Sequence, residues 1–356
     1  MNIMETIELR GCSDDELIKI CQELGLKRFR AIQLFQWVQQ KAVRTWEEMK
    51  NIGDRDRQTL RSRLDLYPLE RVREQRSMDG TRKYLFRLDD GETIECVLMD
   101  YERTKSRDRH TVCVSTQVGC AVGCAFCATG LEGFQRNLSV AEIVGQVLDI
   151  THYVRQEDPD FQVTNLVFMG MGEPLLNYDP VLQAIQLLNH AQGLNIGMRR
   201  ITISTCGVVP RIIQLAKDNP QVGLAVSLHA AQDEVRNHLI PMNRRYPLSQ
   251  LMDACQEYTQ ITHRRITFEV ALTADNARPE EAEGFARLLK GQFGHVNLIP
   301  VNPVLGTGME RPNPALMRRF AQVLEDAGIS VSSREERGAD IEAACGQLRR
   351  QWEGEL

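Results

Sequence analysis

The chain has 356 residues, of which 42% are apolar and 26% charged, with a formal net charge of −5 at pH 7. This composition suits one large folded domain with a small appendage and excludes a disordered chain. No apolar run approaches the roughly 18 residues of a membrane-spanning helix, and the N-terminus lacks the apolar stretch of a secretory signal. We therefore expect a cytoplasmic protein without a membrane segment, whose ten cysteines are reduced.

The first part of the chain is predicted to form a small helical domain at residues 1–70. Between residues 13 and 64 the apolar side chains follow helical spacing, as Ile32, Phe35 and Val38 illustrate. No Gly/Ser-rich linker follows, so this domain should pack on the rest of the chain. Residues 71–105 are predicted to form a β-hairpin linker, because two strand-like runs, YLFRL and ETIECVLM, flank an Asp-Asp-Gly turn.

From residue 111 onward, short apolar runs alternate with amphipathic helical patterns. This alternation predicts an α/β fold with a parallel sheet, curled into a full or partial barrel of six or more βα units. We place the barrel at residues 106–340 and a C-terminal segment at 341–356. The strand runs are 111–116, 164–170, 199–205, 222–228, 266–272, 295–301 and 329–334, and the helical patterns are 140–155, 180–191, 209–217, 247–260, 279–290 and 314–327.

Three cysteines, Cys120, Cys124 and Cys127, lie on the loop that follows the first strand of this barrel. In a reducing compartment, clustered cysteines indicate metal binding or catalysis. A structural zinc site needs four ligands, and the available fourth candidates, Cys113 and His110, lie upstream. Three thiolates that hold a [4Fe-4S] cluster leave one iron open to a further ligand. The spacing therefore favours the cluster, with a zinc-stabilised RNA-binding module as the alternative of a different class.

The cysteine loop, with Phe126 before its last cysteine, resembles that of the radical S-adenosylmethionine superfamily. The resemblance implies a partial (βα)6 barrel, a [4Fe-4S] cluster on the three cysteines, and S-adenosylmethionine bound to the open iron. The stretch MGMGEP after the second strand matches the second motif of that superfamily. Its Gly172 and Glu173 are thereby implied to hold the amino end of the cofactor.

A longer series of motifs is similar to one family within that superfamily, the dual-specificity RNA methyltransferases that act on carbon 2 of adenine in 23S ribosomal RNA and in transfer RNA. Thr116 and Cys206 depart from the pattern, which has serine at both positions. The matching stretches are CVSTQVGC (113–120), GFQRNL (133–138), MGMGEPLLN (169–177), ISTCGVVP (203–210), SLHA (227–230), LIPVNP (298–303) and GADIEAACGQL (338–348).

The resemblance implies three catalytic residues. Cys345 would take a methyl group from a first S-adenosylmethionine, and a radical made from a second would convert it to the carbon that adds to adenine. Glu95 would accept the carbon-2 proton. Cys113 would resolve the adduct through a transient disulfide with Cys345, so that two cofactor molecules are used per turnover.

Read from pattern alone, these residues have simpler interpretations. Cys345 follows two alanines on an apparent helix, where a thiol is usually a small buried apolar group. Cys113 would be core packing in a strand. Glu95 alternates with apolar neighbours and would face solvent, and Glu92 competes with it for the role of the base.

The same resemblance implies further cofactor contacts at Ser204, Ser227, Leu228, His229 and Asn302. RNA would be gripped by the N-terminal helical domain and by a basic segment at residues 103–110, which contains Arg107 and Arg109. The partners expected are 23S ribosomal RNA, transfer RNA, and an electron donor such as a flavodoxin or ferredoxin, and we expect a monomer. A related enzyme that methylates carbon 8 of adenine is the nearest alternative.

Overall fold

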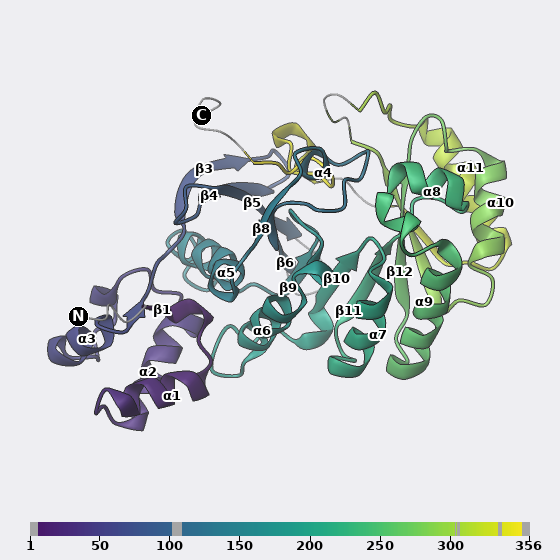
Figure 1. The fold of residues 1–356 in the computed structure, drawn as a ribbon. Coiled ribbons are helices and arrows are strands. Elements are labelled where there is room, and N and C mark those ends of the chain that lie inside the picture. Colours follow the sequence, from purple (N-terminus) through teal and green to yellow (C-terminus); the bar gives the residue numbers. More distant parts are fainter. Residues whose placement is uncertain (1–5, 102–108, 303, 305–306, 334–336, 351–356) are drawn as a thin grey trace.

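One open sheet runs through most of the molecule. The computed structural model describes residues 6–101, 109–302, 304, 307–333 and 337–350. Within those residues the sheet has ten strands, in the spatial order β14-β13-β12-β11-β10-β9-β6-β5-β4-β3. The strands from β6 to β14 pair in parallel. Because β3 and β14 are edges that do not meet, the barrel is partial, with most helices along one side of the sheet (Figure 1).

The parallel strands and their helices follow the predicted alternation closely. The parallel strands are buried on both faces, and strands of this kind need near-continuous apolar runs. These runs are visible in the sequence, so the strands could be predicted. The strands are β6 (Arg109–Cys113), β9 (Asn165–Phe168), β10 (Ile201–Thr205), β11 (Gly223–Ser227), β12 (Ile266–Leu272), β13 (Gly294–Pro300) and β14 (Val331–Ser333). The helices are α5 (Val140–Arg155), α6 (Tyr178–Asn189), α7 (Val209–Asp218), α8 (Asp233–Leu239), α9 (Leu248–Thr262), α10 (Pro279–Leu288) and α11 (Pro314–Asp326).

The predicted hairpin is present, but it is part of the main sheet and not a separate linker. Strands β3 (Glu70–Arg76), β4 (Arg82–Arg87) and β5 (Thr93–Tyr101) form an antiparallel meander, and β5 pairs antiparallel with β6. The sequence pattern did not predict β3, whose residues ERVREQR are charged because they form an edge strand. The hairpin is therefore a rigid extension of the barrel. The division of the chain at residues 70, 105 and 340 remains a prediction.

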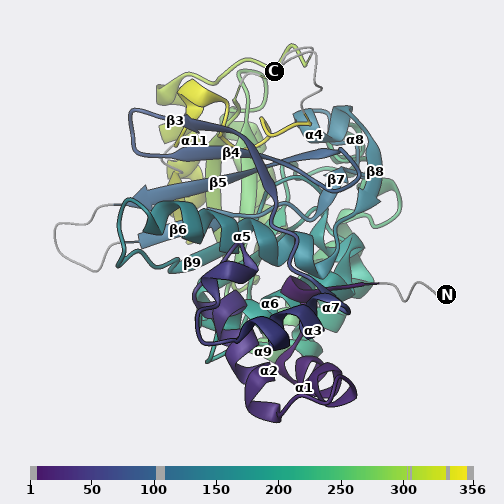
Figure 2. The same cartoon turned by 90° about the vertical axis from the view of Figure 1, so that its left-hand side faces the viewer.

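The N-terminal domain is helical, as predicted. It contains α1 (Asp14–Glu23), α2 (Arg28–Phe35) and α3 (Asp54–Arg61), the short turns η1 (Leu9–Gly11), η2 (Gln36–Gln40) and η3 (Trp46–Glu48), and a parallel pair of β1 (Ile7–Glu8) with β2 (Leu64–Asp65). Helix α1 begins at a capping box between Ser13 and Glu16. Figure 2 shows this domain below α5, on the opposite side of that helix from the meander.

A buried acidic residue holds the helical domain on the barrel. Asp149 of α5 is 0% exposed and accepts two hydrogen bonds from Arg10, at 2.6 and 2.9 Å. Arg44 also donates to it, and so does the backbone N–H of Leu69, at 2.9 Å. A carboxylate so far from water is stable only when it is fully paired, so these contacts fix the two parts together, as the absence of a flexible linker predicted.

Short elements frame the cysteine loop. Strand β7 (Gln117–Gly119) pairs antiparallel with β8 (Phe134–Asn137), and α4 (Ala128–Leu131) follows the last cysteine. Gly119 has a φ of +71°, and a Cβ there would lie 1.9 Å from the carbonyl oxygen of Gly133, so only glycine fits. The remaining short turns are η4 (Pro174–Leu176), η5 (Met198–Arg200), η6 (Pro241–Arg244) and η7 (Ala339–Ile341).

As for membranes, none of the helices in the described ranges combines the length and the apolar character needed to span one.

Candidate active site

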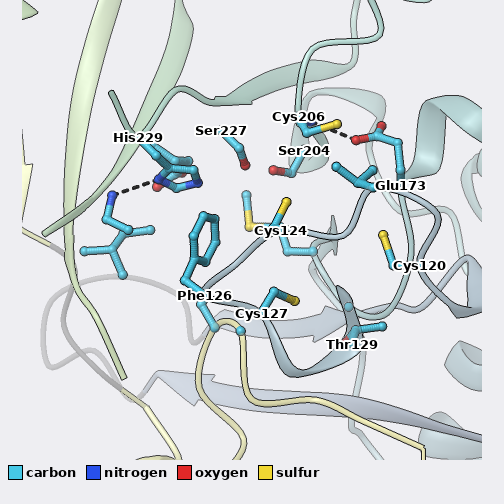
Figure 3. Close-up of a pocket in the computed structure, with 18 of the residues that line it drawn as sticks. Cys120, Cys124, Phe126, Cys127, Thr129, Glu173, Ser204, Cys206, Ser227 and His229 are labelled. Carbon is cyan, nitrogen blue, oxygen red and sulfur yellow. Dashed lines mark hydrogen bonds between the residues drawn. The ribbon is translucent and has the colours of Figure 1, made fainter. Parts of the chain in front are cut away.

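A cavity opens at the carboxyl ends of the parallel strands, where βα barrels place their ligands. It encloses about 1000 Å³ together with its mouth. The cysteine loop forms one side, and the loops after β9, β10, β11 and β13 and the C-terminal segment form the others. Figure 3 shows side chains from these separate parts of the chain around one space.

Cys120, Cys124 and Cys127 surround one end of this cavity, with their sulfur atoms facing a common space (Figure 3). All three thiols are free. Burial is the largest cause that raises the pKa of Cys120 to about 12, and it raises the pKa of Cys124 as well, with the neighbouring thiols adding to both shifts. A positively charged metal group would remove this penalty, so the three thiols fit a [4Fe-4S] cluster that binds each thiolate to a different iron.

Neither sequence candidate for a fourth zinc ligand lies with the three cysteines. Cys113 ends β6 and lines a smaller, neighbouring cavity, while His110 Nδ1 lies 2.9 Å from Asp100. In the described part of the chain, no three His, Cys, Asp or Glu side chains converge on a position for a single metal ion. Cys113 and His110 therefore do not complete a four-ligand zinc site with the three cysteines.

Gly172 and Glu173 lie beside the cysteines, as the resemblance implies. Gly172 has a φ of +100°, and a Cβ there would lie 2.6 Å from the Gln117 side chain. The Glu173 carboxylate is 3% exposed and accepts hydrogen bonds from the N–H groups of Leu175 (3.0 Å) and Cys206 (2.7 Å). Burial raises the pKa of the Glu173 carboxyl group and is the largest effect on it, while the hydrogen bonds to the carboxylate act in the opposite direction. A buried carboxylate of this kind is suited to an ammonium group on a ligand.

Ser204, Ser227 and His229 line the opposite wall (Figure 3). His229 Nδ1 accepts a hydrogen bond from the N–H of Ala271 (2.9 Å), and its ring contacts Phe126 edge-on at 4.7 Å between centroids. Burial, followed by the charge of Arg236, lowers the pKa of His229 to about 3. The imidazole is therefore neutral, which suits a binding role. Leu228 differs from its neighbours, because its side chain is 0% exposed and does not line the cavity.

Cys345 lies where two cavities meet. It lines the main cavity with the three cysteines, and it lines the smaller cavity with Cys113. The side-chain N–H of Asn302 donates to the Cys345 carbonyl (3.2 Å), and the Gly346 carbonyl accepts from Ala128 N–H (2.8 Å). The predicted helix around Cys345 is wrong, because this residue lies in a turn. The turn presents its thiol to both cavities.

Glu95 is buried and not exposed to solvent as its alternation predicted. One carboxylate oxygen lies 2.9 Å from Lys83 Nζ, and the other accepts a hydrogen bond from the Arg349 N–H at 3.0 Å. Burial is the largest cause that raises the pKa of Glu95, and Lys83 opposes it. The carboxyl group lines neither cavity, because the C-terminal segment covers it. The competing residue, Glu92, lies 3.1 Å from Arg350 in an ion pair.

The basic segment is described only at its end. Arg103, Lys105 and Arg107 lie outside the described residues. Arg109 stacks over the Tyr101 ring, 5.3 Å from its centroid, and donates to Thr111 Oγ1 (3.0 Å). The part that can be seen is thus occupied in local contacts, and its contribution to RNA binding stays a prediction.

Two residues of the site were not predicted from the sequence. In the sequence, Cys206 stood out only as a departure from the family's serine and was given no role in the site. In the structure it lines the cavity, and its N–H donates to Glu173. Arg236 on α8 lies fully buried behind the cavity, and no sequence pattern singled it out, since α8 itself was not predicted.

The chain matches two family models. One, described as "Radical SAM superfamily", covers residues 114–289, and the other, "Ribosomal RNA large subunit methyltransferase N-terminal domain", covers residues 7–66. The first range includes all three cysteines and the Gly172–Glu173 pair. The second coincides with the helical domain.

The chain is also similar to whole proteins over its full length. It is 67% identical to a "Probable dual-specificity RNA methyltransferase RlmN" of Desulfitobacterium hafniense (strain Y51), over 100% of this chain and 99% of the relative. With a protein of the same description from Heliobacterium modesticaldum the identity is 52%, over 98% and 91% of the two chains.

Among solved structures, a radical SAM methyltransferase from Sphaerobacter thermophilus is 45% identical and superposes with a TM-score of 0.91, over 96% of this chain and 99% of that one. The chain therefore belongs to the dual-specificity RNA methyltransferase family of the radical S-adenosylmethionine superfamily.

Proposed function

We propose that this chain methylates carbon 2 of adenine in RNA, at the peptidyl transferase centre of 23S ribosomal RNA and at adenine 37 of transfer RNAs. The full-length identity to proteins described as dual-specificity RNA methyltransferases supports this. The observation that carries the proposal is the place of Cys345, between the cavity with the three cysteines and the cavity with Cys113.

The site residues fit the two cofactors that the family implies. A [4Fe-4S] cluster would be held by Cys120, Cys124 and Cys127, and S-adenosylmethionine by Gly172, Glu173 and the walls at Ser204, Ser227, His229 and Asn302, with Leu228 contributing only backbone. When bound, they supply a carbon-centred radical, the chemistry that an electron-poor ring carbon requires.

Cys345 and Cys113, which lie outside the cysteine loop, carry out the remaining steps of the proposed reaction. Cys345 takes a methyl group by nucleophilic substitution and presents it at the main cavity. Once that methyl carbon is bonded to adenine, Cys113 attacks the Cys345 sulfur from the smaller cavity. The product leaves, and a Cys113–Cys345 disulfide remains to be reduced. Two S-adenosylmethionine molecules are consumed per turnover in this scheme.

Glu95 is the proposed acceptor of the carbon-2 proton. Burial already raises its pKa, which favours proton uptake once it is freed. Both of its oxygens are engaged, by Lys83 and by Arg349 N–H. The C-terminal segment must therefore shift when RNA enters, so that Glu95 can reach the base.

The remaining parts of the proposal concern partners. RNA would lie against the helical domain, and the target adenine would leave its stack to enter the cavity, as base-modifying enzymes require. A flavodoxin or ferredoxin would supply the electron. The enzyme would act as a monomer in the cytoplasm.

The test is anaerobic reconstitution with iron and sulfide, followed by methyl transfer to fragments of 23S ribosomal RNA and to transfer RNA. The wild type should methylate both. Cys345→Ala should transfer nothing, and Cys113→Ala should accumulate a protein–RNA adduct that survives denaturing electrophoresis. Cys21→Ala, which removes a fully buried thiol of α1 in the helical domain, is the matched control and should remain active.

Mass spectrometry of digested RNA identifies the methylated carbon. Methyl at carbon 8 would replace our assignment by the alternative activity, and methylation of a single RNA class would remove the dual specificity. A colourless protein that contains zinc and no iron after anaerobic purification would refute the enzyme itself and leave the RNA-binding module.

A further inference from the structure

A buried arginine, Arg236, lies behind the cavity, and no carboxylate among the described residues is hydrogen-bonded to its guanidinium. Arg236 stands on α8 and is 0% exposed. Each of its hydrogen bonds goes to an uncharged oxygen. The acceptors are the carbonyls of Leu228 (3.0 Å from Nε), Cys206 (2.7 Å from Nη2) and Ser227 (2.9 Å from Nη2), and Oδ1 of Asn243 (2.7 Å from Nη1). Burying an unpaired cation is costly, so this charge needs compensation from elsewhere.

Asp233 is connected to the Arg236 guanidinium through the side-chain amide of Asn243. Asp233 Oδ1 accepts from the Asn243 amide (2.8 Å), and that amide's oxygen in turn accepts from Arg236. The same Asp233 oxygen also accepts from the N–H of Leu248 (2.9 Å). Asp233 is partly exposed, so water and these two donors weaken its hold on the buried charge.

Thiols of the cavity also lie near this guanidinium. Burial is the largest cause that lowers the pKa of Arg236, and Cys206 and Cys124 act in the opposite direction, ahead of Asp233. Helix α8 also supports the cysteine loop directly, since the Ala125 N–H donates to the Leu239 carbonyl at 3.0 Å.

Two of the carbonyls that Arg236 binds belong to residues that line the cavity. Cys206 follows β10 and Ser227 ends β11, and both line the cavity wall. Cys206 in turn donates its N–H to Glu173. One guanidinium thus holds the ends of two neighbouring strands and the backbone that orients the Glu173 carboxylate.

We propose that Arg236 is a positioning residue for the iron–sulfur cluster, whose buried positive charge stabilises the reduced state of a cluster on Cys120, Cys124 and Cys127. Three thiolates make the bound cluster anionic, and reduction adds one electron from the external donor without making or breaking a bond. Net charge near a cluster sets its reduction potential, and a cation in a poorly solvated site acts strongly. Arg236 therefore raises the potential and makes the electron easier to accept. This inference rests on the cluster, and not on the choice of RNA.

The test compares reduction potentials of reconstituted variants by redox titration, monitored by electron paramagnetic resonance without RNA. Arg236→Gln should shift the potential in the negative direction, and Arg236→Lys, which keeps the charge, should stay close to wild type. Asp233→Asn, which removes an opposing charge at constant shape, should shift it in the positive direction. Arg155→Gln is the matched control, because Arg155 also donates to backbone carbonyls but lies on α5; its potential should be unchanged.

The outcomes separate this inference from the proposed function. Equal potentials in wild type, Arg236→Gln and Asp233→Asn, at full iron content, would overturn the role of Arg236 while leaving the enzyme assignment intact. So would an equal shift in the Lys and Gln variants. If both Arg236 variants fail to fold, the direction of the Asp233→Asn shift decides: a positive shift supports the inference and no shift overturns it. Failure to incorporate iron at all would instead refute the cluster.

Discussion

Lys83 and Glu95 form an ion pair that is almost completely removed from solvent, with side-chain exposures of 3% and 0% and 2.9 Å between Nζ and Oε1. Removing one partner of such a pair leaves an uncompensated charge, at a cost of about 3–5 kcal/mol. We expect Lys83→Met to lower the unfolding free energy by about that amount in urea titrations at neutral pH. The double variant Lys83→Met/Glu95→Gln should recover most of the loss; no recovery would show that Lys83 acts through packing alone.

The same variant should have a distinctive pH dependence. Burial raises the native pKa of Glu95 above its usual 4.5, and without Lys83 it rises further. The unfolded-state pKa is the same in both proteins, so the pH dependence of the stability loss comes from the two native pKa values. The stability loss of Lys83→Met should therefore grow as the pH rises from the native pKa of Glu95 in the wild type towards the higher native pKa in the variant, and should be smallest in acid. A loss that is constant from pH 4.5 to 8 would contradict the pairing.

His229 provides a second titration at the scale of a single residue. The native pKa of His229 is about 3, below the 6.5 of an ordinary histidine. Between these two pH values the unfolded chain binds a proton at this histidine and the native chain does not. Stability is then lost as the pH falls below 6.5, by about 2 kcal/mol between pH 6.5 and 5. Urea titrations should show this slope in the wild type and a shallower one in His229→Gln. An unchanged slope in the variant would assign the effect to other groups.

At the scale of elements, Asp149 on α5 joins the helical domain to the barrel through Arg10, Arg44 and the Leu69 N–H. We expect Asp149→Ala to cost about 3–5 kcal/mol, because the buried guanidinium of Arg10 and the partly buried one of Arg44 lose their partner. Limited proteolysis should then cut near residues 64–70, where the domain is released. Glu23→Ala, which breaks an exposed pair with Arg63 at 3.7 Å, is the control and should cost no more than about 1 kcal/mol.

Elements whose burial produces a regular apolar pattern in the sequence were predicted. Elements whose conformation depends on their neighbours in the fold were missed. The parallel strands were predicted because both of their faces are buried. Strand β3 was missed because an edge strand can be charged throughout. Helix α8, DEVRNHL, was missed because it is short and mostly polar.

The predicted helix at Cys345 failed for a local reason. Gly338, Glu342 and Gly346 have φ angles of +66°, +52° and +82°, which no right-handed helix accommodates. For the candidate site, motif resemblance proposed the residues, and the structure places Cys345 at the edge of both cavities. What spacing could not supply was Arg236, whose partners are backbone carbonyls from distant loops.

At the scale of the whole molecule, the C-terminal segment closes over the site from the far end of the chain. Replacing Arg349 by proline removes the N–H that Glu95 accepts at 3.0 Å, whereas Arg349→Ala retains it. A lost hydrogen bond to a charged group costs about 1.5–3 kcal/mol. We expect Arg349→Pro to speed the labelling of Cys345 by a thiol reagent by at least about tenfold, with Arg349→Ala near wild type. Equal rates in the two variants would show that this contact does not hold the segment.

The pairing of β5 with β6 sets Val97 opposite Cys113, two residues along the strand from Glu95. Glu95, the proposed base, and Cys113, the proposed resolving thiol, therefore lie on two adjacent, hydrogen-bonded strands of one sheet. The sheet sets the distance between them before a substrate binds. Cys345 lies instead in a turn of the C-terminal segment, outside the sheet. Under the proposed mechanism, substitutions that loosen or restrain this segment should change the rate of turnover, whereas substitutions that stiffen the barrel should not.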